Sequence, residues 1–409
     1  RERSTGAAHG RTPTPAGAVT VGAYDYITFD NLNFQGFNGV GINTNSRTGI
    51  TVQNCDFSFI ADVGIQTVGN GNYLKVLNCT FTEINSGGVF TKNSTNNLIQ
   101  GNTFTNVGNI PGMGGSGDLG YTAIYSYGDN ALIQYNSITR TGYVGIRWDG
   151  NATVIKGNFI NYTNYIKDDG GGIYCYPNNG TSQQNQYTTR IVRDNIVMNA
   201  PGAVAGGEPA GVAQGYCIFN DGSSPDINYI NNTTYAGRFG LFFQGGYDLK
   251  VDSNVVYAPS QIGIYFTNST TNPITNNSIT NNISVINVSN AGVGCGAGKY
   301  ALDVYGISSL PADWTASKNI YANPLDQTNG WIYSPLGTGS PCKSVSEWQT
   351  QLGKDAGSTG SPLIVSDASK IRFEYNETGS PKTITLGTSY VDMRNVSYPN
   401  TITIPPYSS

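Results

Sequence analysis

Histidine is nearly absent from this sequence of 409 residues, and charged residues make up only 12% of it. The single histidine, His9, lies in a start rich in Gly, Thr and Pro that we expect to be disordered or left over from expression. A Ser-His-Asp triad, or any other acid–base scheme based on histidine, is therefore not expected. The lack of a basic cluster and a net charge of -4 argue against a nucleic-acid partner. No apolar run approaches the roughly 20 residues that would span a bilayer, so membrane insertion is not expected either.

Cysteine is scarce as well, with six residues in the chain and no CxxC pair. That spacing argues against a zinc site, and we expect no bound metal of this kind. We expect most of the cysteines to be buried thiols. Cys295 and Cys342 lie in loop-rich sequence, which makes them the best candidates for a disulfide.

Glycine (53 residues) and tyrosine (27 residues) are abundant, and Asn and Thr are frequent too. The hydrophobic fraction of 38% is low for a globular protein but too high for a disordered one. Many tyrosines and asparagines with few charges indicate an all-β extracellular protein that binds sugars. We therefore expect a secreted, periplasmic or cell-surface protein, and the sequence does not predict its oligomeric state.

A short motif recurs along the chain with a period of about 23 residues. Its form is aliphatic-x-x-Asn/Cys-x-aliphatic/aromatic, as in VQNCDF (52–57), VLNCTF (76–81) and IQYNSI (133–138). The residues in its fourth position are Leu32, Cys55, Cys79, Asn102, Asn136, Asn158, Asn195, Asn232, Asn254 and Asn277. Asparagine repeated at one position suits a scaffold in which each side-chain amide bonds to its neighbour in the next coil.

A second motif, Gly-aliphatic-x-x, alternates with the first, as in GIQT (64–67), GIRW (145–148) and GIYF (263–266). Strands of three to five residues with short turns describe a parallel β-solenoid, because one coil cannot bury its apolar face alone. Residues 26–282 resemble the right-handed parallel β-helix proteins that act on polysaccharides. The resemblance implies an all-β fold, a right-handed parallel β-helix with about 23 residues per coil.

Three spacings exceed the period, at 34, 37 and 37 residues. We interpret the excess as loop insertions near residues 108–121, 164–186 and 200–215, which should emerge on one side and wall a cleft. The expected organisation is a disordered or expression-derived start (1–18), a β-helix (19–300), an irregular extension (301–361) with a short helix, and a small antiparallel β unit (362–409). We expect this last unit to cap the C-terminal end of the β-helix, where strand edges would otherwise be exposed.

Alternation along the strand GIRW points Ile146 and Trp148 into the core and Arg147 outward. The same register gives one outward column that includes Tyr125, Arg147, Tyr174 and Ile218, and a second that includes Tyr127, Asp149, Tyr176 and Asn220. Aromatic side chains on the outside of a sheet are unusual unless something covers them. We expect Arg147 and these four tyrosines to bind sugar; the alternative is that inserted loops fold over them.

Acidic residues gather near the same face. Asp168 and Asp169 precede Tyr174 in KDDGGGIYCY, Asp149 lies one coil earlier, and Asp221 lies one coil later. With coils roughly 4.8 Å apart, we expect these carboxylates within about 5–10 Å, the range of the paired carboxylates of glycoside hydrolysis.

Glu208, in the third insertion, is expected to reach over the cleft as a further substrate contact. Each acid also has a plainer interpretation. Asp149 and Asp221 could shape turns, Glu208 could be a solvated loop acid, and the cluster could bind calcium.

The segment DGGGIY (169–174), followed by a strand that ends in NDGSS (220–224), resembles a pattern in bacterial β-helix glycoside hydrolases. That resemblance implies that Asp169 and Asp221 are the catalytic pair, with Asp149 in reserve beside Asp168. We therefore expect hydrolysis of a polysaccharide or oligosaccharide with no required cofactor.

Two other functions stay open. A polysaccharide lyase would use a base such as Lys92, Arg147 or Lys167, with Ca2+ to neutralise an acidic sugar. The acids near the cleft argue against a polyuronate substrate, because like charges repel. The other function is a glycan-binding solenoid without catalysis.

Overall fold

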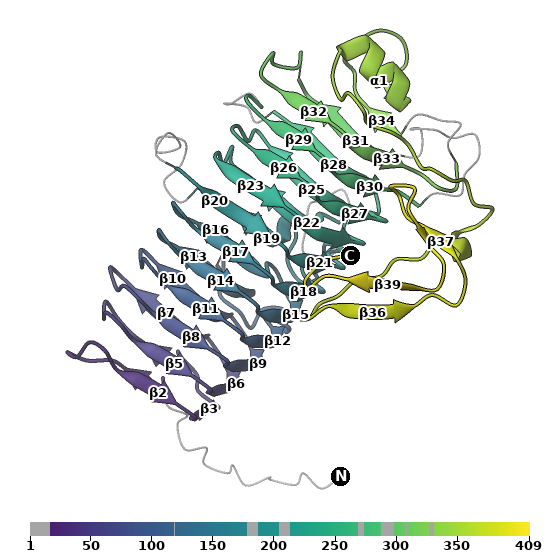
Figure 1. Ribbon diagram of the computed structural model, residues 1–409. Coiled ribbons are helices and arrows are strands. Elements are labelled where there is room, and N and C mark those ends of the chain that lie inside the picture. The colour runs from purple at the N-terminus through teal and green to yellow at the C-terminus, as the bar shows by residue number, and fades with distance from the viewer. Residues whose placement is uncertain are drawn as a thin grey trace, which may run out of the picture.

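The computed structural model describes residues 17–117, 119–177, 187–203, 213–268, 274–287, 298–307, 309–326 and 331–409. Within these residues the chain coils into a long stack of strands, which rises from the purple N-terminal coils to the green C-terminal coils in Figure 1. Three sheets of 13, 11 and 11 strands run along the stack in this part of the chain. His9 and most of the predicted start at residues 1–18 lie outside the described residues.

Sheet A includes the strands that contain the second sequence motif, Gly-aliphatic-x-x. In spatial order its strands are β1 (Val19–Thr20), β4 (Ile42–Asn43), β7 (Val63–Val68), β10 (Gly87–Lys92), β13 (Thr122–Tyr127), β16 (Ile146–Asp149), β19 (Gly170–Cys175), β22 (Gly215–Asn220), β25 (Phe239–Gln244), β28 (Ile262–Thr267), β31 (Tyr300–Tyr305), β34 (Ile332–Tyr333) and β35 (Cys342–Lys343). Its pairs are parallel as far as β34, and β35 closes the sheet antiparallel.

The first sequence motif spans the end of a sheet B strand, the turn that follows it and the start of a sheet C strand, as residues 52–57 do with β5 (Thr51–Gln53) and β6 (Asp56–Ile60). Sheet B consists of β2 (Thr28–Asp30), β5 (Thr51–Gln53), β8 (Lys75–Leu77), β11 (Leu98–Gln100), β14 (Leu132–Gln134), β17 (Val154–Lys156), β20 (Arg190–Arg193), β23 (Ile227–Ile230), β26 (Lys250–Asp252), β29 (Ser278–Thr280) and β32 (Thr315–Ser317). Sheet C consists of β3 (Asn33–Gln35), β6 (Asp56–Ile60), β9 (Thr80–Ile84), β12 (Thr103–Val107), β15 (Ser137–Thr141), β18 (Phe159–Asn161), β21 (Ile196–Met198), β24 (Thr233–Tyr235), β27 (Val255–Tyr257), β30 (Ile283–Val285) and β33 (Ile320–Ala322). From β1 to β33 each coil gives one strand to each sheet in turn, which confirms the predicted parallel β-helix.

Inward side chains of equivalent coils stack on one another to form a continuous core. In sheet C, Phe34, Phe57, Phe81 and Phe104 stack with ring centroids 4.9, 4.9 and 4.6 Å apart. These distances match the spacing of neighbouring strands, so in these four coils each aromatic ring packs directly on the ring of the next coil.

The cysteines divide between this core and one disulfide. Cys55, Cys79, Cys175 and Cys217 are buried free thiols, as the sequence predicted. Cys342 is disulfide-bonded. Its predicted partner, Cys295, lies outside the described residues.

Asparagines between sheets B and C form a hydrogen-bonded ladder along the stack. The backbone N–H and the side-chain amide of Asn158 both donate to Oδ1 of Asn195, each at 2.9 Å. The same pair of bonds joins, in order, Asn102, Asn136, Asn158, Asn195, Asn232, Asn254, Asn282 and Asn319. The side chain of Asn319 then donates to Oδ1 of Asp355 at 2.9 Å, so a buried carboxylate ends the ladder.

The ladder corrects one position of the sequence repeat. Asn277 had been placed in the motif, but it precedes β29 and accepts from the N–H of Leu249 instead. The ladder residue of that coil is Asn282, because the loop inserted before β29 lengthens the coil. The regular coils also continue past residue 290, to Asn319.

A left-handed backbone residue comes just before the ladder position and turns the chain sharply from sheet B into sheet C. Asn78, Gly101 and Asn231 have φ values of 52°, 68° and 53°. Glycine and asparagine adopt this conformation more readily than other residues, which explains why the motif carries them there.

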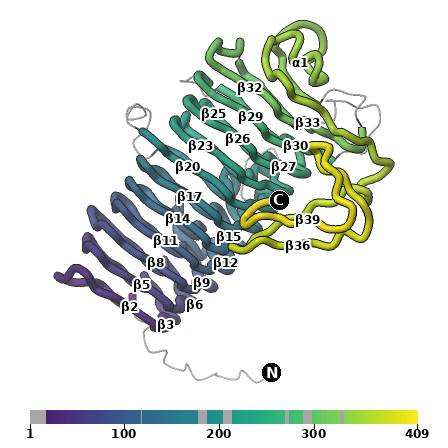
Figure 2. The backbone as a smooth tube through the Cα atoms, viewed as in Figure 1, coloured from purple at the N-terminus to yellow at the C-terminus, as the bar shows by residue number. Residues whose placement is uncertain are grey.

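The C-terminal unit lies along the side of the β-helix and not over its end, contrary to the prediction. In Figure 2 the yellow segment that contains β36 (Lys382–Thr385), β37 (Tyr390–Val391), β38 (Ser397–Tyr398) and β39 (Thr401–Ile404) runs beside sheet C. Its aromatic residues stack on those of sheet C, with Phe373 4.8 Å from Tyr257 and Tyr375 6.2 Å from Phe159. Outward-facing aromatic rings of sheet C thus determine where the C-terminal unit packs. The strand pattern of the C-terminal sequence did not indicate this position.

The short helix α1 (Val345–Leu352) lies at the C-terminal end of the stack instead (Figure 1). A capping box between Ser344 and Glu347 begins it, and Gly353 ends it in the left-handed conformation. Trp348 is fully buried and packs against Trp314 of the last coils, so it closes the core. None of the helices in the described part of the chain is both long and apolar enough to cross a membrane.

We predict that Asn195→Ala lowers the free energy of unfolding by about 3 kcal/mol, because it leaves two buried donors of Asn158 without their acceptor. Chemical denaturation followed by circular dichroism would measure the change. Asn33→Ala, on an exposed position of β3, is the matched control and should change stability by less than about 0.5 kcal/mol. Equal effects of the two substitutions would contradict a stabilising ladder.

Candidate functional site

Strand pairing establishes which side chains share the outer face of sheet A. Tyr125, Arg147 and Tyr174 occupy one outward column, as predicted. The next coil had been misaligned by one residue: Phe219, not Ile218, pairs with Tyr174, and Ile218 lies in the core. An odd shift exchanges the two faces of a strand, which is why a one-residue error reverses the assignment.

The same correction changes the second column. Tyr127 pairs with Asp149, as predicted. Asn220 pairs with Cys175 and is fully buried, so it belongs to the interior. Asp221 follows it directly and therefore lies level with Tyr176 at the end of the sheet A strands.

Arg147 stands at the centre of a group of tyrosines. Its guanidinium carbon lies 5.1 Å from the ring centroid of Tyr174, 5.9 Å from that of Tyr127 and 6.0 Å from that of Tyr176. Its Nε donates to the Tyr127 hydroxyl at 3.1 Å, and that hydroxyl donates to the backbone carbonyl of Tyr176 at 3.0 Å. We call Arg147, Tyr127, Tyr174, Tyr176 and Asp221 the Arg147 cluster.

Asp221 is the acid of this cluster. Its Oδ2 accepts from the Tyr174 hydroxyl at 2.7 Å, and its Oδ1 accepts from the Gly222 N–H at 2.6 Å. Burial raises the pKa of the Asp221 carboxyl, although both hydrogen bonds and the Arg147 charge act in the opposite direction. A carboxyl with a raised pKa holds its proton to higher pH, as a general acid must.

The tyrosines of this face differ in how far solvent reaches them. Tyr125, Tyr127 and Tyr174 are buried, and the rings of Tyr125 and Tyr127 stack at 4.4 Å. Tyr176 is 40% exposed. Of the four tyrosines expected to bind sugar, Tyr176 is thus the one that presents a ring to solvent. Tyr127 and Tyr174 pack around Arg147, and Tyr125 stacks on Tyr127.

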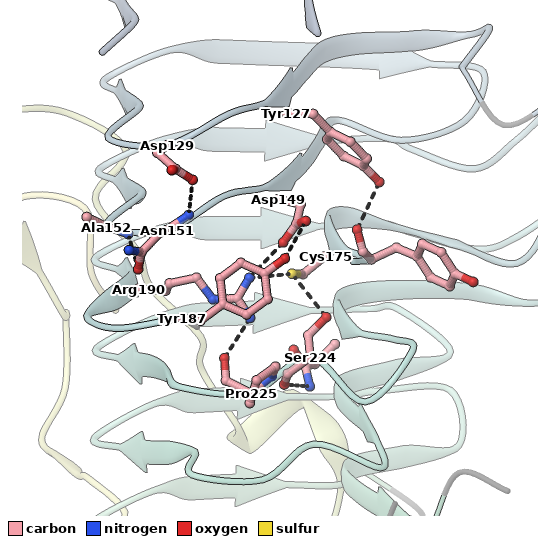
Figure 3. A network of polar contacts seen from close by, with 12 residues as sticks. Tyr127, Asp129, Asp149, Asn151, Ala152, Cys175, Tyr187, Arg190, Ser224 and Pro225 are labelled. Carbon is pink, nitrogen blue, oxygen red and sulfur yellow. Dashed lines mark hydrogen bonds and ion pairs between the residues drawn. The ribbon is translucent and has the colours of Figure 1, made fainter. Parts of the chain in front are cut away.

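Asp149 takes part in a polar network with Arg190 and Tyr187, shown in Figure 3. Its Oδ1 forms an ion pair with the Arg190 guanidinium at 2.8 Å, and its Oδ2 accepts from the Tyr187 hydroxyl at 2.7 Å. Arg190 is fully buried and also donates to the backbone carbonyl of Pro225. These contacts hold Asp149 at the corner between sheets A and B, and they give it a structural role there.

Asp168 and Asp169 lie at the other end of sheet A. Asp169 precedes β19, where its N–H donates to the Gln214 carbonyl, whereas Asp221 follows β22. Six strand residues at about 3.3 Å each put about 20 Å between the two ends. The strand register therefore contradicts the expected distance of about 5–10 Å between Asp169 and Asp221.

The side chains of this acidic pair differ in surroundings. Oδ1 of Asp168 accepts from the N–H groups of Ala203 and Gln214 at 3.2 and 2.5 Å, so Asp168 ties the third insertion to the sheet. Asp169 is exposed and left-handed (φ 55°), and its carbonyl accepts from the Tyr143 hydroxyl. Glu208 lies outside the described residues.

A small pocket of about 120 Å³ lies away from the Arg147 cluster. It is lined by Arg140, Tyr162, Thr163, Tyr165 and Pro201. Its walls carry one guanidinium and no carboxylate, so it is no candidate for acid catalysis.

Sequence reasoning missed Asp303, on β31. Its column of sheet A holds Phe219, Phe242 and Tyr265 on the preceding coils, and Asp303 is the acid that follows them. The residue is only 4% exposed, and burial raises the pKa of its carboxyl to about 7. The repeat could have revealed it, because LDVY continues the strand pattern with an acid at an outward aromatic position.

Metal ligands are not grouped in the described part of the chain. No set of three or more His, Cys, Asp or Glu side chains there is placed to hold an ion. The direct test for bound calcium is to compare activity with and without a chelator.

We predict that Asp149→Asn lowers the free energy of unfolding by about 3–5 kcal/mol, because it leaves the Arg190 charge buried without its partner. Chemical denaturation would measure this loss. Adding Arg190→Met should restore part of it, since the unpaired charge is then removed. A fully stable Asp149→Asn variant would show that the ion pair is not structural.

Asp303 should make stability depend on pH. Its folded pKa of about 7 lies above the ordinary value, so the folded protein binds the proton more tightly and loses stability as pH rises from about 4 to 7. Asp303→Asn should therefore raise stability by about 1–4 kcal/mol at alkaline pH and have little effect at about pH 4. Thermal unfolding of both proteins across this range would measure the difference, and parallel pH profiles would contradict it.

Comparisons with known proteins bear on the fold. A family model described as "Right handed beta helix region" matches residues 16–234. None of the curated proteins compared matches this chain.

Several solved structures resemble the chain. One is a mutant of the periplasmic alginate epimerase AlgG, at 11% identity over 80% of this chain and 75% of that chain, with a TM-score of 0.46. Another is a mannuronic acid specific polysaccharide family 6 lyase from the human gut microbiota, at 14% identity over 84% and 86%, with a TM-score of 0.43. A third is the catalytic domain of a GH87 α-1,3-glucanase in complex with nigerose, at 16% identity over 73% and 55%, with a TM-score of 0.37. At these identities the likeness concerns the fold alone.

Proposed function

Because this chain belongs to the right-handed β-helix family, we propose that the outer face of sheet A binds a polysaccharide or oligosaccharide and hydrolyses a glycosidic bond. Many functions use one fold, so the proposal depends on the side chains of the site and not on the β-helix. The observation that carries it is the Arg147 cluster, in which a carboxyl with a raised pKa lies beside a fixed cation and an exposed aromatic ring.

Asp221 is the proposed general acid. The carboxyl would donate its proton to the leaving glycosidic oxygen, and the Tyr174 hydroxyl would stabilise the carboxylate that remains, since it already donates to Oδ2. Burial keeps the protonated form available at higher pH than for an ordinary aspartate. Activity should accordingly fall as pH rises through the pKa of Asp221.

Substrate contact is assigned to Tyr176 and Arg147. The half-exposed Tyr176 ring offers a flat surface to the apolar face of a sugar, and the Arg147 guanidinium, itself only 5% exposed, adds a fixed positive charge beside that ring. The surrounding tyrosines hold Arg147 in one orientation, as the bond to Tyr127 shows.

The second carboxylate of hydrolysis is less defined than the first. Asp149 lies two coil spacings from Asp221, about 10 Å, near the upper limit for enzymes that invert configuration. Its oxygens are already bound by Arg190 and Tyr187. Asp169 is about 20 Å away along the sheet. We therefore assign only the acid, and the base is to be identified by substitution.

A lyase is the second candidate, favoured by Arg147, which could neutralise the carboxylate of an acidic sugar. The base is the difficulty. Burial raises the pKa of the Tyr174 hydroxyl well above its ordinary value and that of Tyr127 likewise, so neither readily gives up its proton to act as a base. Hydrolysis fits this site better. An extracellular location is proposed as well, since a polysaccharide substrate would be met there.

We predict that Asp221→Asn lowers hydrolytic activity about 100-fold or more, because it removes the proton donor. Neutral and acidic polysaccharides would be screened by a reducing-end assay, with and without chelator, and by the ultraviolet absorbance of an unsaturated product. Asp169→Asn, the same change at the far end of the sheet, should keep most of the activity. Loss of activity in both variants would support the pairing expected from the sequence, and an unsaturated product lost in chelator would indicate a lyase. No activity on any polysaccharide would count against the enzyme and favour a glycan-binding protein.

A further inference from the structure

Asp303 lies in an outward column of sheet A that is otherwise aromatic in this part of the stack. On β31 it pairs with Tyr265 of β28 on one side and with Tyr333 of β34 on the other. The inward neighbours Leu302 and Val304 belong to the core, so the Asp303 side chain points outward. This position is three coil spacings, about 14 Å, from β22, the strand that Asp221 follows, and belongs to a separate site.

Four tyrosines surround this carboxylate. Tyr265 and Tyr333 lie on the two neighbouring strands, and Tyr300 and Tyr305 lie on the strand of Asp303 itself. The rings of Tyr300 and Tyr333 stack at 4.9 Å, and the ring of Tyr305 lies 6.2 Å from that of Tyr333. Tyr305 is 50% exposed, so the group borders solvent.

Asp303 differs from Asp149, an equally buried carboxylate of the outer face, in how its charge is compensated. Asp149 and Asp303 are each 4% exposed. Asp149 is compensated by the Arg190 charge and the Tyr187 hydroxyl. Oδ1 of Asp303 has no hydrogen-bond partner in the described part of the chain, and burial is the sole cause of its raised pKa. A buried charge without compensation costs several kcal/mol, so this carboxylate is arranged to receive either a proton or a cation.

The surroundings select the kind of cation. A hard metal ion needs several oxygen ligands, and no group of three or more His, Cys, Asp or Glu side chains in the described residues is placed to supply them here. Tyrosine rings, in contrast, attract organic cations through their π faces, and an aromatic enclosure is the usual way proteins bind ammonium groups. We propose that Asp303, together with Tyr265, Tyr300, Tyr305 and Tyr333, forms a binding site for an organic ammonium group. The amino group of an unacetylated amino sugar is one source of such a group, and a free alkylamine is another.

Calorimetric titration with glucosamine and with methylammonium would test this site on the full chain. Both probes should bind to the wild type, and Asp303→Asn should weaken binding about tenfold or more by removing the charge. N-acetylglucosamine, which carries no positive charge, should bind far more weakly. Asp313→Asn, the same change at an exposed turn, is the matched control and should bind like the wild type.

Tyr305→Leu provides a second variant, because its exposed ring can be removed without opening the core. It should weaken amine binding about threefold to tenfold through loss of one aromatic face. Unchanged glucosamine affinity in Asp303→Asn, or equal affinity for the acetylated sugar, would overturn the proposal. Binding of Ca2+ that displaces the amine would also overturn it, in favour of a metal site. Since amine binding needs no bond cleavage, these results are independent of the activity assigned to Asp221.

Discussion

The amide ladder between sheets B and C is the interaction on which the rest of the structure depends. From Asn136 to Asn282, each ladder asparagine accepts two hydrogen bonds from the asparagine of the preceding coil and donates two to that of the next coil, as Asn158 does. Neighbouring coils are thereby held in a fixed register. A buried amide must be satisfied, and only a neighbour in register can satisfy it. The repeated asparagine thus fixes the alignment of each coil with its neighbours. This alignment determines which side chains lie next to one another on the outer face of sheet A.

Two kinds of buried charge follow from that register. At the end of the ladder, Asp355 accepts from Asn319, Tyr321 and Trp348, and a carboxylate so well supplied with donors stabilises the closure of the stack. Asp149 is similarly matched by Arg190. Asp221 and Asp303 are matched less completely, and burial raises the pKa of both. Groups that a protein buries without full compensation are candidates for function, because their retention has an energetic cost.

The β-helix was predictable from the sequence because its evidence is local. The period of about 23 residues, the asparagine position and the alternation of GIRW each reflect one coil and its neighbour. The site was predictable only in part. Arg147 and the four tyrosines do lie together. The strand β22 had been aligned one residue out of register, so Asn220 and not Asp221 was placed in the column of Tyr176. Asp169 and Asp221 seem adjacent when coils are counted, but they lie at opposite ends of their strands.

The sequence by itself determined the solenoid, its coil length and most of its scaffold residues, because every coil repeats the same local pattern. Asn282 and Asn319 were identified only from the structure. Only the tertiary structure decided which acids are compensated. The partner of Asp149 is Arg190, 41 residues later and on another sheet, and the cover over sheet C comes from Phe373 and Tyr375 near the chain end. Such contacts join segments whose separation in the sequence does not follow from the repeat of about 23 residues. Burial and charge compensation, which set the chemistry of Asp221 and Asp303, are properties of the stacked coils and not of any one of them.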